Sequence, residues 1–126
     1  MNPSWYTFLG VIIGADRLNS PREQAALAAL DPRPEDLALA ERGIRLDTAA
    51  RGQLIQSLGR LGHDEVITGL ELAWRIAAAD GVPNTRELEL IRLVGREAFG
   101  PHQEDLVVEY LRATQTARDA LRRLGL

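Results

Sequence analysis

Apolar residues along the chain recur at intervals of three and four positions, and no stretch shows sustained two-residue alternation. In the middle of the chain, Ile67, Leu70, Trp74 and Ala77 fall on one face of a helix. The pattern predicts an all-α fold: a compact bundle of about seven helices with no strand. The predicted helices cover residues 5–15, 20–30, 35–42, 47–62, 64–79, 84–99 and 102–124.

Two of these helices begin with the same arrangement of residues. Ser20 can cap a helix whose first residue is Pro21 and whose third is Glu23. Asn84 and Glu87 have the same spacing at the start of a later helix. Both segments therefore predict a capping box, in which the glutamate carboxylate accepts a hydrogen bond from the N-cap amide.

The first and last predicted helices are both expected to bury apolar side chains. The apolar run at 5–15 has about half the length needed to cross a bilayer, so we interpret it as a core helix and expect no transmembrane segment. Trp5 and Tyr6 are expected to anchor it, and Trp74 is expected in the core. In the last helix the spacing predicts an inward stripe of Val107, Tyr110, Thr114, Ala117, Leu121 and Leu124.

Composition narrows the possible functions. A chain of 126 residues fits one domain, residues 1–126, and its 45% hydrophobic but 5% aromatic content predicts an aliphatic core. With a net charge of −3, nucleic acid is a poor partner, because phosphate binding needs basic patches. The arginines are interspersed with acids, a pattern that predicts that they lie on solvent-exposed faces of helices. The absence of cysteine excludes disulfides, thiolate catalysis and zinc–sulfur sites.

The chain contains an internal repeat. Residues 15–23 read Ala-Asp-Arg-Leu-Asn-Ser-Pro-Arg-Glu, and residues 79–87 read Ala-Asp-Gly-Val-Pro-Asn-Thr-Arg-Glu. The offset is 64 without a gap, and it also pairs the apolar residues Ile12 with Ile76 and Leu27 with Ile91. Because turn residues and core positions share one offset, we interpret the repeat as a duplicated helix–turn–helix.

Each copy carries an aspartate followed seven positions later by a glutamate: Asp16 and Glu23, then Asp80 and Glu87. A duplicated pair that packs about a pseudo-twofold axis can bring four such carboxylates together, where they repel unless a cation lies between them. These oxygen ligands suit calcium, magnesium or manganese. The alternative is structural: the glutamates complete capping boxes, and the aspartates bond turn amides.

No constellation of catalytic residues emerges. His63 and His102 each lie beside acids near a predicted helix start, which is typical of polar helix-start residues. Ser57 lies mid-helix without a nucleophile elbow. There is no phosphate-binding loop and no dinucleotide fingerprint. We therefore expect a protein that is not an enzyme.

Residues 73–87, Ala-Trp-Arg-Ile-Ala-Ala-Ala-Asp-Gly-Val-Pro-Asn-Thr-Arg-Glu, resemble the signature of TerB-like domains, in which an alanine-rich helix runs into Ala-Asp-Gly. The resemblance implies a non-enzymatic stress-response domain of the tellurite-resistance type. It also implies a divalent cation held by the acids at positions 16, 23, 80 and 87. Localisation would be cytoplasmic, or peripheral at the inner membrane.

A second hypothesis is a metal-free protein-interaction module, related to the N-terminal domain of membrane-anchored J-domain co-chaperones. Either hypothesis implies a protein partner, which can be membrane-associated. The first copy departs from the family pattern, because Arg17 stands where the second copy has Gly81. If the turn needs a left-handed residue, arginine there costs on the order of 1 kcal/mol.

Overall fold

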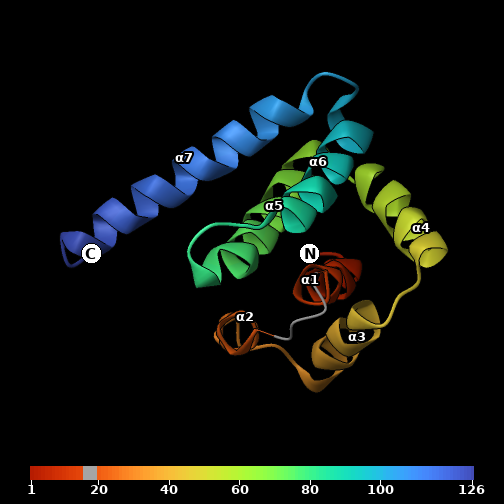
Figure 1. Ribbon diagram of the computed structural model, residues 1–126, viewed down its shortest axis with the longest axis horizontal. Helices are drawn as coiled ribbons and strands as arrows, with labels where there is room; N and C mark the ends of the chain where they lie inside the picture. The colour runs from red at the N-terminus through yellow and green to blue at the C-terminus, as the bar shows by residue number, and fades with distance from the viewer. Residues whose placement is uncertain (16–19) are drawn as a thin grey trace.

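A computed structural model describes residues 1–15 and 20–126 of the chain. The described residues form seven α-helices and one short 3₁₀-helix, with no strand among them, which confirms the predicted all-α bundle (Figure 1). The elements are α1 (Ser4–Ile13), α2 (Pro21–Ala28), α3 (Pro34–Ile44), α4 (Thr48–Gly59), α5 (His63–Ala77), η1 (Ala78–Asp80), α6 (Thr85–Phe99) and α7 (Glu104–Arg123). None of the described helices combines the length and apolar character that a membrane crossing requires.

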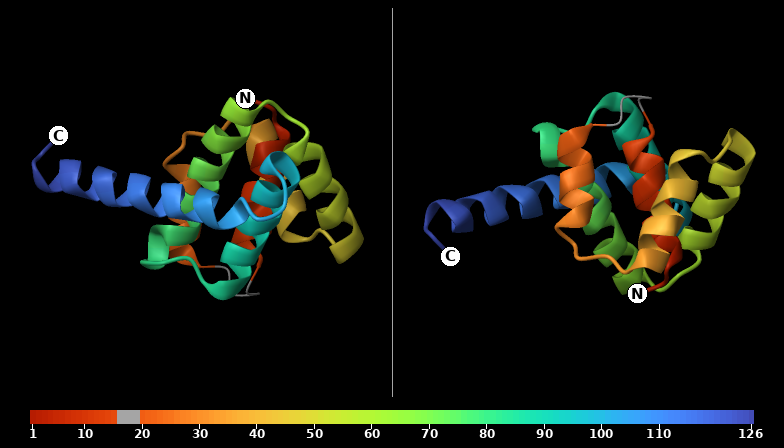
Figure 2. Two further views of the ribbon diagram at one scale, coloured as in Figure 1. Left: turned by 90° about the horizontal axis from the view of Figure 1, so that it is seen from above. Right: turned by 90° about the horizontal axis from the view of Figure 1, so that it is seen from below.

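Helix α1 lies at the centre of the bundle, surrounded by α2, α3, α4 and α5 (Figures 1 and 2). Its side chains supply much of the core: Trp5, Phe8, Leu9 and Ile12 are completely buried. The remaining core is mainly aliphatic, as the composition predicts, and Trp74 belongs to it.

Close packing of α1 against α3 depends on glycine. A Cβ atom added to Gly10 would lie 1.9 Å from the carbonyl oxygen of Ala40. A Cβ atom added to Gly43 would lie 1.9 Å from the carbonyl oxygen of Thr7. Backbone therefore meets backbone at two points of this seam, where no side chain fits. The predicted end of this helix at Arg42 was wrong by two residues, since α3 continues to Ile44.

The helix boundaries follow the repeat. Helices α1 and α5 end at Ile13 and Ala77, and helices α2 and α6 begin at Pro21 and Thr85, in both cases 64 positions apart. Burial follows it too: the pairs Ile12 and Ile76, Leu27 and Ile91, and Glu23 and Glu87 are all buried. The offset seen in the sequence therefore marks equivalent places in the fold.

Helix α7 begins beside α5 and α6, and its C-terminal half projects beyond the bundle (Figure 2). The predicted inward stripe was therefore wrong. Val107 is buried, but Tyr110, Leu121 and Leu124 are 47%, 50% and 74% exposed. The core instead receives Val107, Val108 and Leu111, which all lie in the first half of the helix.

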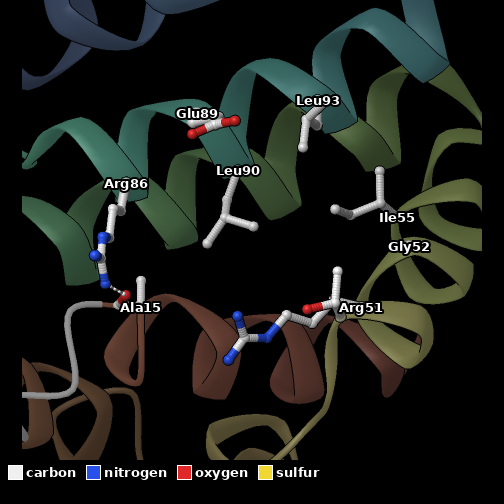
Figure 3. Close-up of a pocket in the computed structure, with 9 residues that line it drawn as sticks. Ala15, Arg51, Gly52, Ile55, Arg86, Glu89, Leu90 and Leu93 are labelled. Atoms are coloured by element: carbon white, nitrogen blue, oxygen red, sulfur yellow. Dashed lines mark hydrogen bonds between the residues drawn. The ribbon is translucent and has the colours of Figure 1, made fainter.

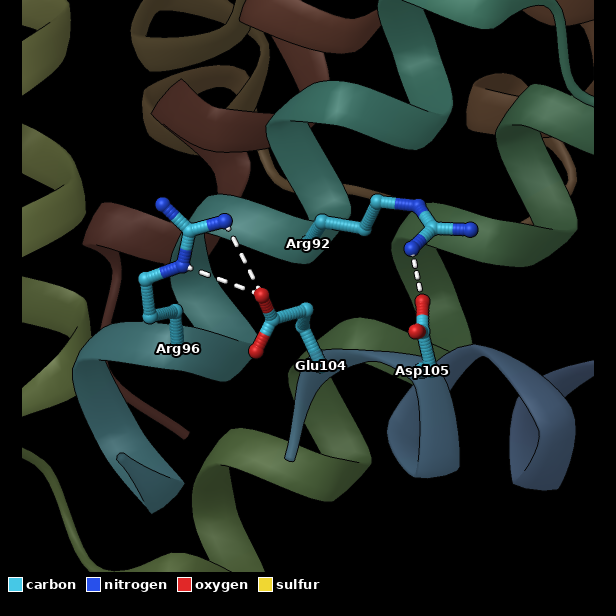
Figure 4. Close-up of polar contacts among 4 residues, drawn as sticks. All are labelled: Arg92, Arg96, Glu104 and Asp105. Atoms are coloured by element: carbon cyan, nitrogen blue, oxygen red, sulfur yellow. Dashed lines mark hydrogen bonds and ion pairs between the residues drawn. The ribbon is translucent and has the colours of Figure 1, made fainter. Parts of the chain in front are cut away.

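Ion pairs fix the start of α7 to α6 (Figure 4). The Arg96 guanidinium lies 2.9 Å from the Glu104 carboxylate, and Arg92 pairs with Asp105. Hydrogen bonding of the Glu104 carboxylate to its own backbone amide, supported by Arg96, lowers the pKa of this group. The charged form of Glu104 is thus part of the attachment of α7.

Candidate functional site

The second repeat turn is built from η1 and the residues that follow it. Gly81 has a φ of +124°, a conformation that side-chain-bearing residues rarely adopt. Asn84 then caps α6: its Oδ1 accepts a hydrogen bond from the Glu87 amide at 2.9 Å, and Glu87 Oε1 accepts one from the Asn84 amide at 2.9 Å. The predicted second capping box is confirmed. The corresponding Arg17 lies outside the described residues.

The two repeats contact each other through their turns. The Ser20 hydroxyl, at the N-cap of α2, donates a hydrogen bond to Asp80 Oδ2 at 2.5 Å. The Arg86 guanidinium, at the start of α6, donates one to the carbonyl oxygen of Ala15 at 3.3 Å. Each bond joins one repeat to the other, so Ala15 and Ser20 of the first repeat lie close to the second turn and the start of α6.

The predicted acids occupy different environments. Glu23 and Glu87 are each 2% exposed, whereas Asp80 is exposed. The Ser20 hydroxyl accepts a hydrogen bond from the Glu23 amide at 3.3 Å, the first half of the other predicted capping box. Asp16 lies outside the described residues. Within residues 1–15 and 20–126, no three acids or histidines gather closely enough to hold a metal ion.

A groove of about 410 Å³ lies between α4 and α6, at the end of α1 (Figure 3). Its apolar floor is formed by Ile55 from α4, Leu90 and Leu93 from α6, and Ala15 at the end of α1. Ile55 is buried, while the two leucines remain partly exposed. Thr48, Gly52 and Glu89 also line the groove.

Two arginines, Arg51 from α4 and Arg86 from α6, line the groove (Figure 3). The ion pairs found among the described residues include neither of them. The Arg51 Nε atom is fully buried and has no hydrogen-bond partner in the described part of the chain. A buried guanidinium donor without a partner costs free energy, but an acceptor from solvent can reach Arg51 only through the part of the side chain that lines the groove.

The sequence interpretation missed this groove. Arg51 looks like any other arginine on a helix that carries both polar and apolar residues, and we had expected a solvated position for it. Its proximity to Leu90 and Leu93 depends on how α4 packs on α6, and helix packing is not visible in the spacing of either helix alone.

Comparisons with protein-family models, with curated proteins and with solved structures find no match for this chain. The TerB-like interpretation therefore stays a prediction that rests on residues 73–87 and their repeat.

Proposed function

We propose that this chain is a non-enzymatic protein-interaction domain whose α4–α6 groove binds a short apolar peptide segment bearing a carboxylate. The observation that carries the proposal is a pair of groove-lining arginines, Arg51 and Arg86, that belong to none of the ion pairs found among the described residues and lie beside an apolar floor. A partner carboxylate would pair with these guanidinium groups, and apolar side chains of the partner would cover Leu90 and Leu93.

The chemistry of the groove gives each part of the partner a role. Arginine presents planar, paired donors that suit a carboxylate, and such charge-assisted bonds are stronger than neutral ones. Covering an exposed leucine contributes through the area removed from water, about 1.5–3 kcal/mol for a fully buried side chain. The arginines would fix the orientation of the partner, while the floor would supply affinity.

The test is a selection of random 12-residue peptides displayed on phage, carried out on the full chain. We expect enrichment of peptides that combine Asp or Glu with Leu, Ile or Phe. Binding of the selected peptides should weaken about tenfold or more in Arg86→Glu, since charge reversal places like charges together. Lack of enrichment, or enrichment of basic peptides, would contradict the proposal.

The repeat supplies a matched control for this variant. Arg22 occupies the position in α2 that corresponds to Arg86 in α6, 64 positions earlier, and it does not line the α4–α6 groove. Arg22→Glu makes the same change in net charge. It should leave peptide affinity unchanged, so an equal loss in both variants would mean that overall charge, and not the groove, governs binding.

A second proposal is the divalent cation at the paired turns, in a stress-response domain of the TerB-like type. It is supported by the contact of Asp80 with the opposite repeat and by Glu87 Oε2, which is buried without a hydrogen-bond partner in the described part of the chain. The described residues alone do not complete a site, so such a site would need Asp16. No step of the interaction proposal depends on this cation.

Calorimetry of chelator-treated protein with calcium, magnesium and manganese tests the cation directly. Binding should release or absorb heat and raise the melting temperature at millimolar metal. Asp80→Asn should weaken it more than His102→Ala, a distant histidine variant. No heat and no change in melting temperature would contradict the cation, and would leave the peptide groove unaffected.

A further inference from the structure

The exposed side of α7 carries an apolar stripe whose larger members are largely exposed, although the Tyr110 hydroxyl donates a hydrogen bond to Glu71 of α5 at 2.8 Å. Leu106, Tyr110, Leu121 and Leu124 are 60%, 47%, 50% and 74% exposed. Exposed alanines continue the stripe between these larger residues, at Ala113, Ala117 and Ala120. A stripe of this length on one helix is unusual for a surface that contacts only water.

The spacing within the stripe is that of a coiled coil. Counting from Leu106, apolar residues follow at intervals of four, three, four, three and four, up to Leu124, which is the alternation of the a and d positions of a heptad. Leu121 lies beside this seam, next to Ala120. This face is distinct from the one that packs on the bundle, which carries Val107, Val108 and Leu111. The stripe is thus free to receive a second helix while the first contact persists.

We propose that α7 is a homodimerisation helix that pairs antiparallel with α7 of a second copy of this chain. An antiparallel register about position 115 joins Leu106 to the partner's Leu124, Tyr110 to the partner's Ala120, and Ala113 to the partner's Ala117. The largest ring in the stripe then lies opposite a methyl group, which lets the two helices approach evenly.

Charge complementarity favours this orientation. In the same register, Glu109 lies between the Leu106 and Tyr110 layers, and the partner's Arg123 lies between the matching layers of its own helix. Both residues are exposed, and neither belongs to an ion pair found among the described residues. The twofold symmetry creates this pair twice, once at each end, whereas parallel helices would keep the two charges apart.

The projecting half of α7 gives a physical reason for the pairing. Isolated helical segments of about ten residues are marginal in water, and most helical stability in proteins comes from packing of an apolar face. In the dimer, the projecting half of each α7 would lie along the packed half of the other.

Sedimentation equilibrium of the full chain tests the proposal. We expect a concentration-dependent species of twice the monomer mass. Ala117→Glu should weaken association about tenfold or more, because it places carboxylates in the centre of an apolar seam. The matched control is Ala38→Glu, at an exposed alanine of α3, which should associate like the unaltered chain. Far-ultraviolet circular dichroism of each variant verifies that it folds.

Charge reversal tests the orientation. Glu109→Arg and Arg123→Glu should each weaken self-association, since each creates two like-charged pairs. An equimolar mixture of the two variants should regain dimer, because every pair in the mixed dimer is again of opposite charge. A chain that stays monomeric at millimolar concentration, a dimer unaffected by Ala117→Glu, or a mixture that does not recover would each overturn the proposal.

Discussion

The two repeats are alike at several buried positions and different at outward ones. Their buried positions correspond: Glu23 and Glu87 are each 2% exposed, and Leu27 and Ile91 are both in the core. The outward positions diverge. Where α6 has Leu90 and Leu93 on the groove floor, α2 has alanine at both equivalent positions.

This difference shows which features belong to the fold and which to the proposed function. Inward residues are constrained by packing, so the same hydrophobic or capping role recurs at the same offset. Outward residues are free of that constraint. The groove is therefore a property of the second repeat and of α4, and not of the duplicated unit.

The largest expected effect concerns a buried position that departs from this likeness, because the two repeats differ greatly in side-chain size there. At the offset of 64, Gly10 corresponds to Trp74. The first repeat has glycine there because the backbone of α3 lies against α1 at this point. Gly10→Ala should lower the free energy of unfolding by about 3 kcal/mol or more, since its Cβ would collide with the backbone of Ala40. Urea unfolding monitored by circular dichroism measures the loss.

Gly52→Ala is the matched control for this substitution. Gly52 lies within α4, and an added Cβ atom there would meet nothing within 4 Å. Alanine should stabilise that helix by up to about 1 kcal/mol. Equal destabilisation by the two substitutions would show that the α1–α3 seam is looser than its geometry indicates.

The next effect tests the likeness of the repeats. Glu87→Ala removes the acceptor of the Asn84 amide and should lower the free energy of unfolding by about 1–3 kcal/mol. Glu23→Ala should cost a similar amount, because Glu23 has the same burial and the same place relative to its N-cap. A loss confined to one of the two variants would break the equivalence of the two helix starts.

A smaller effect tests the difference between the repeats. Leu90→Ala gives the second repeat the residue of the first, Ala26, and should weaken binding of selected peptides about tenfold through lost apolar contact. The opposite substitution, Ala26→Leu, should not change affinity. Fluorescence anisotropy of labelled peptides measures both, and an increase in affinity for Ala26→Leu would place the binding surface on α2.

The smallest effect concerns the ion pair that attaches α7 to α6, for which the first repeat has no equivalent. Arg96 pairs with Glu104, and the position equivalent to Arg96 is Pro32, which lies beyond the end of α2. Because the pKa of Glu104 is lowered in the folded protein, its charged carboxylate stabilises the fold fully when the pH is above the ordinary pKa of about 4.5. That contribution is lost as the pH falls through the lowered folded value.

Glu104→Gln should therefore lower the free energy of unfolding at neutral pH. Below about pH 4.5, the free energy of unfolding should fall less steeply in the variant than in the unaltered chain. Urea unfolding of both proteins across this range measures the difference. Parallel pH profiles for the two would contradict a role for the charged form of Glu104.

The sequence predicted those features that depend on local chemistry. Helical spacing, the Asn84–Glu87 capping box and the turn at Gly81 are all local, and each is confirmed. The offset of the repeat also marks equivalent helix ends, since α1 and α5 end, and α2 and α6 begin, 64 positions apart. Whether the four predicted acids bind a cation stays a prediction.

Features set by the packing of distant segments could not be predicted. The stripe on α7 has the periodicity of a buried face, yet most of its residues are exposed, because periodicity shows that a face is apolar and not which element covers it. Similarly, Arg51 becomes a candidate binding residue only after α4 is seen beside α6.

The most direct test of the proposed groove is a second peptide selection, on the variant that carries both Arg51→Glu and Arg86→Glu. If the two guanidinium groups bind a partner carboxylate, the selected peptides should change from acidic to basic, while Leu, Ile and Phe persist because the apolar floor is unaltered. Selection of the same acidic peptides by the variant and by the unaltered chain would contradict the account.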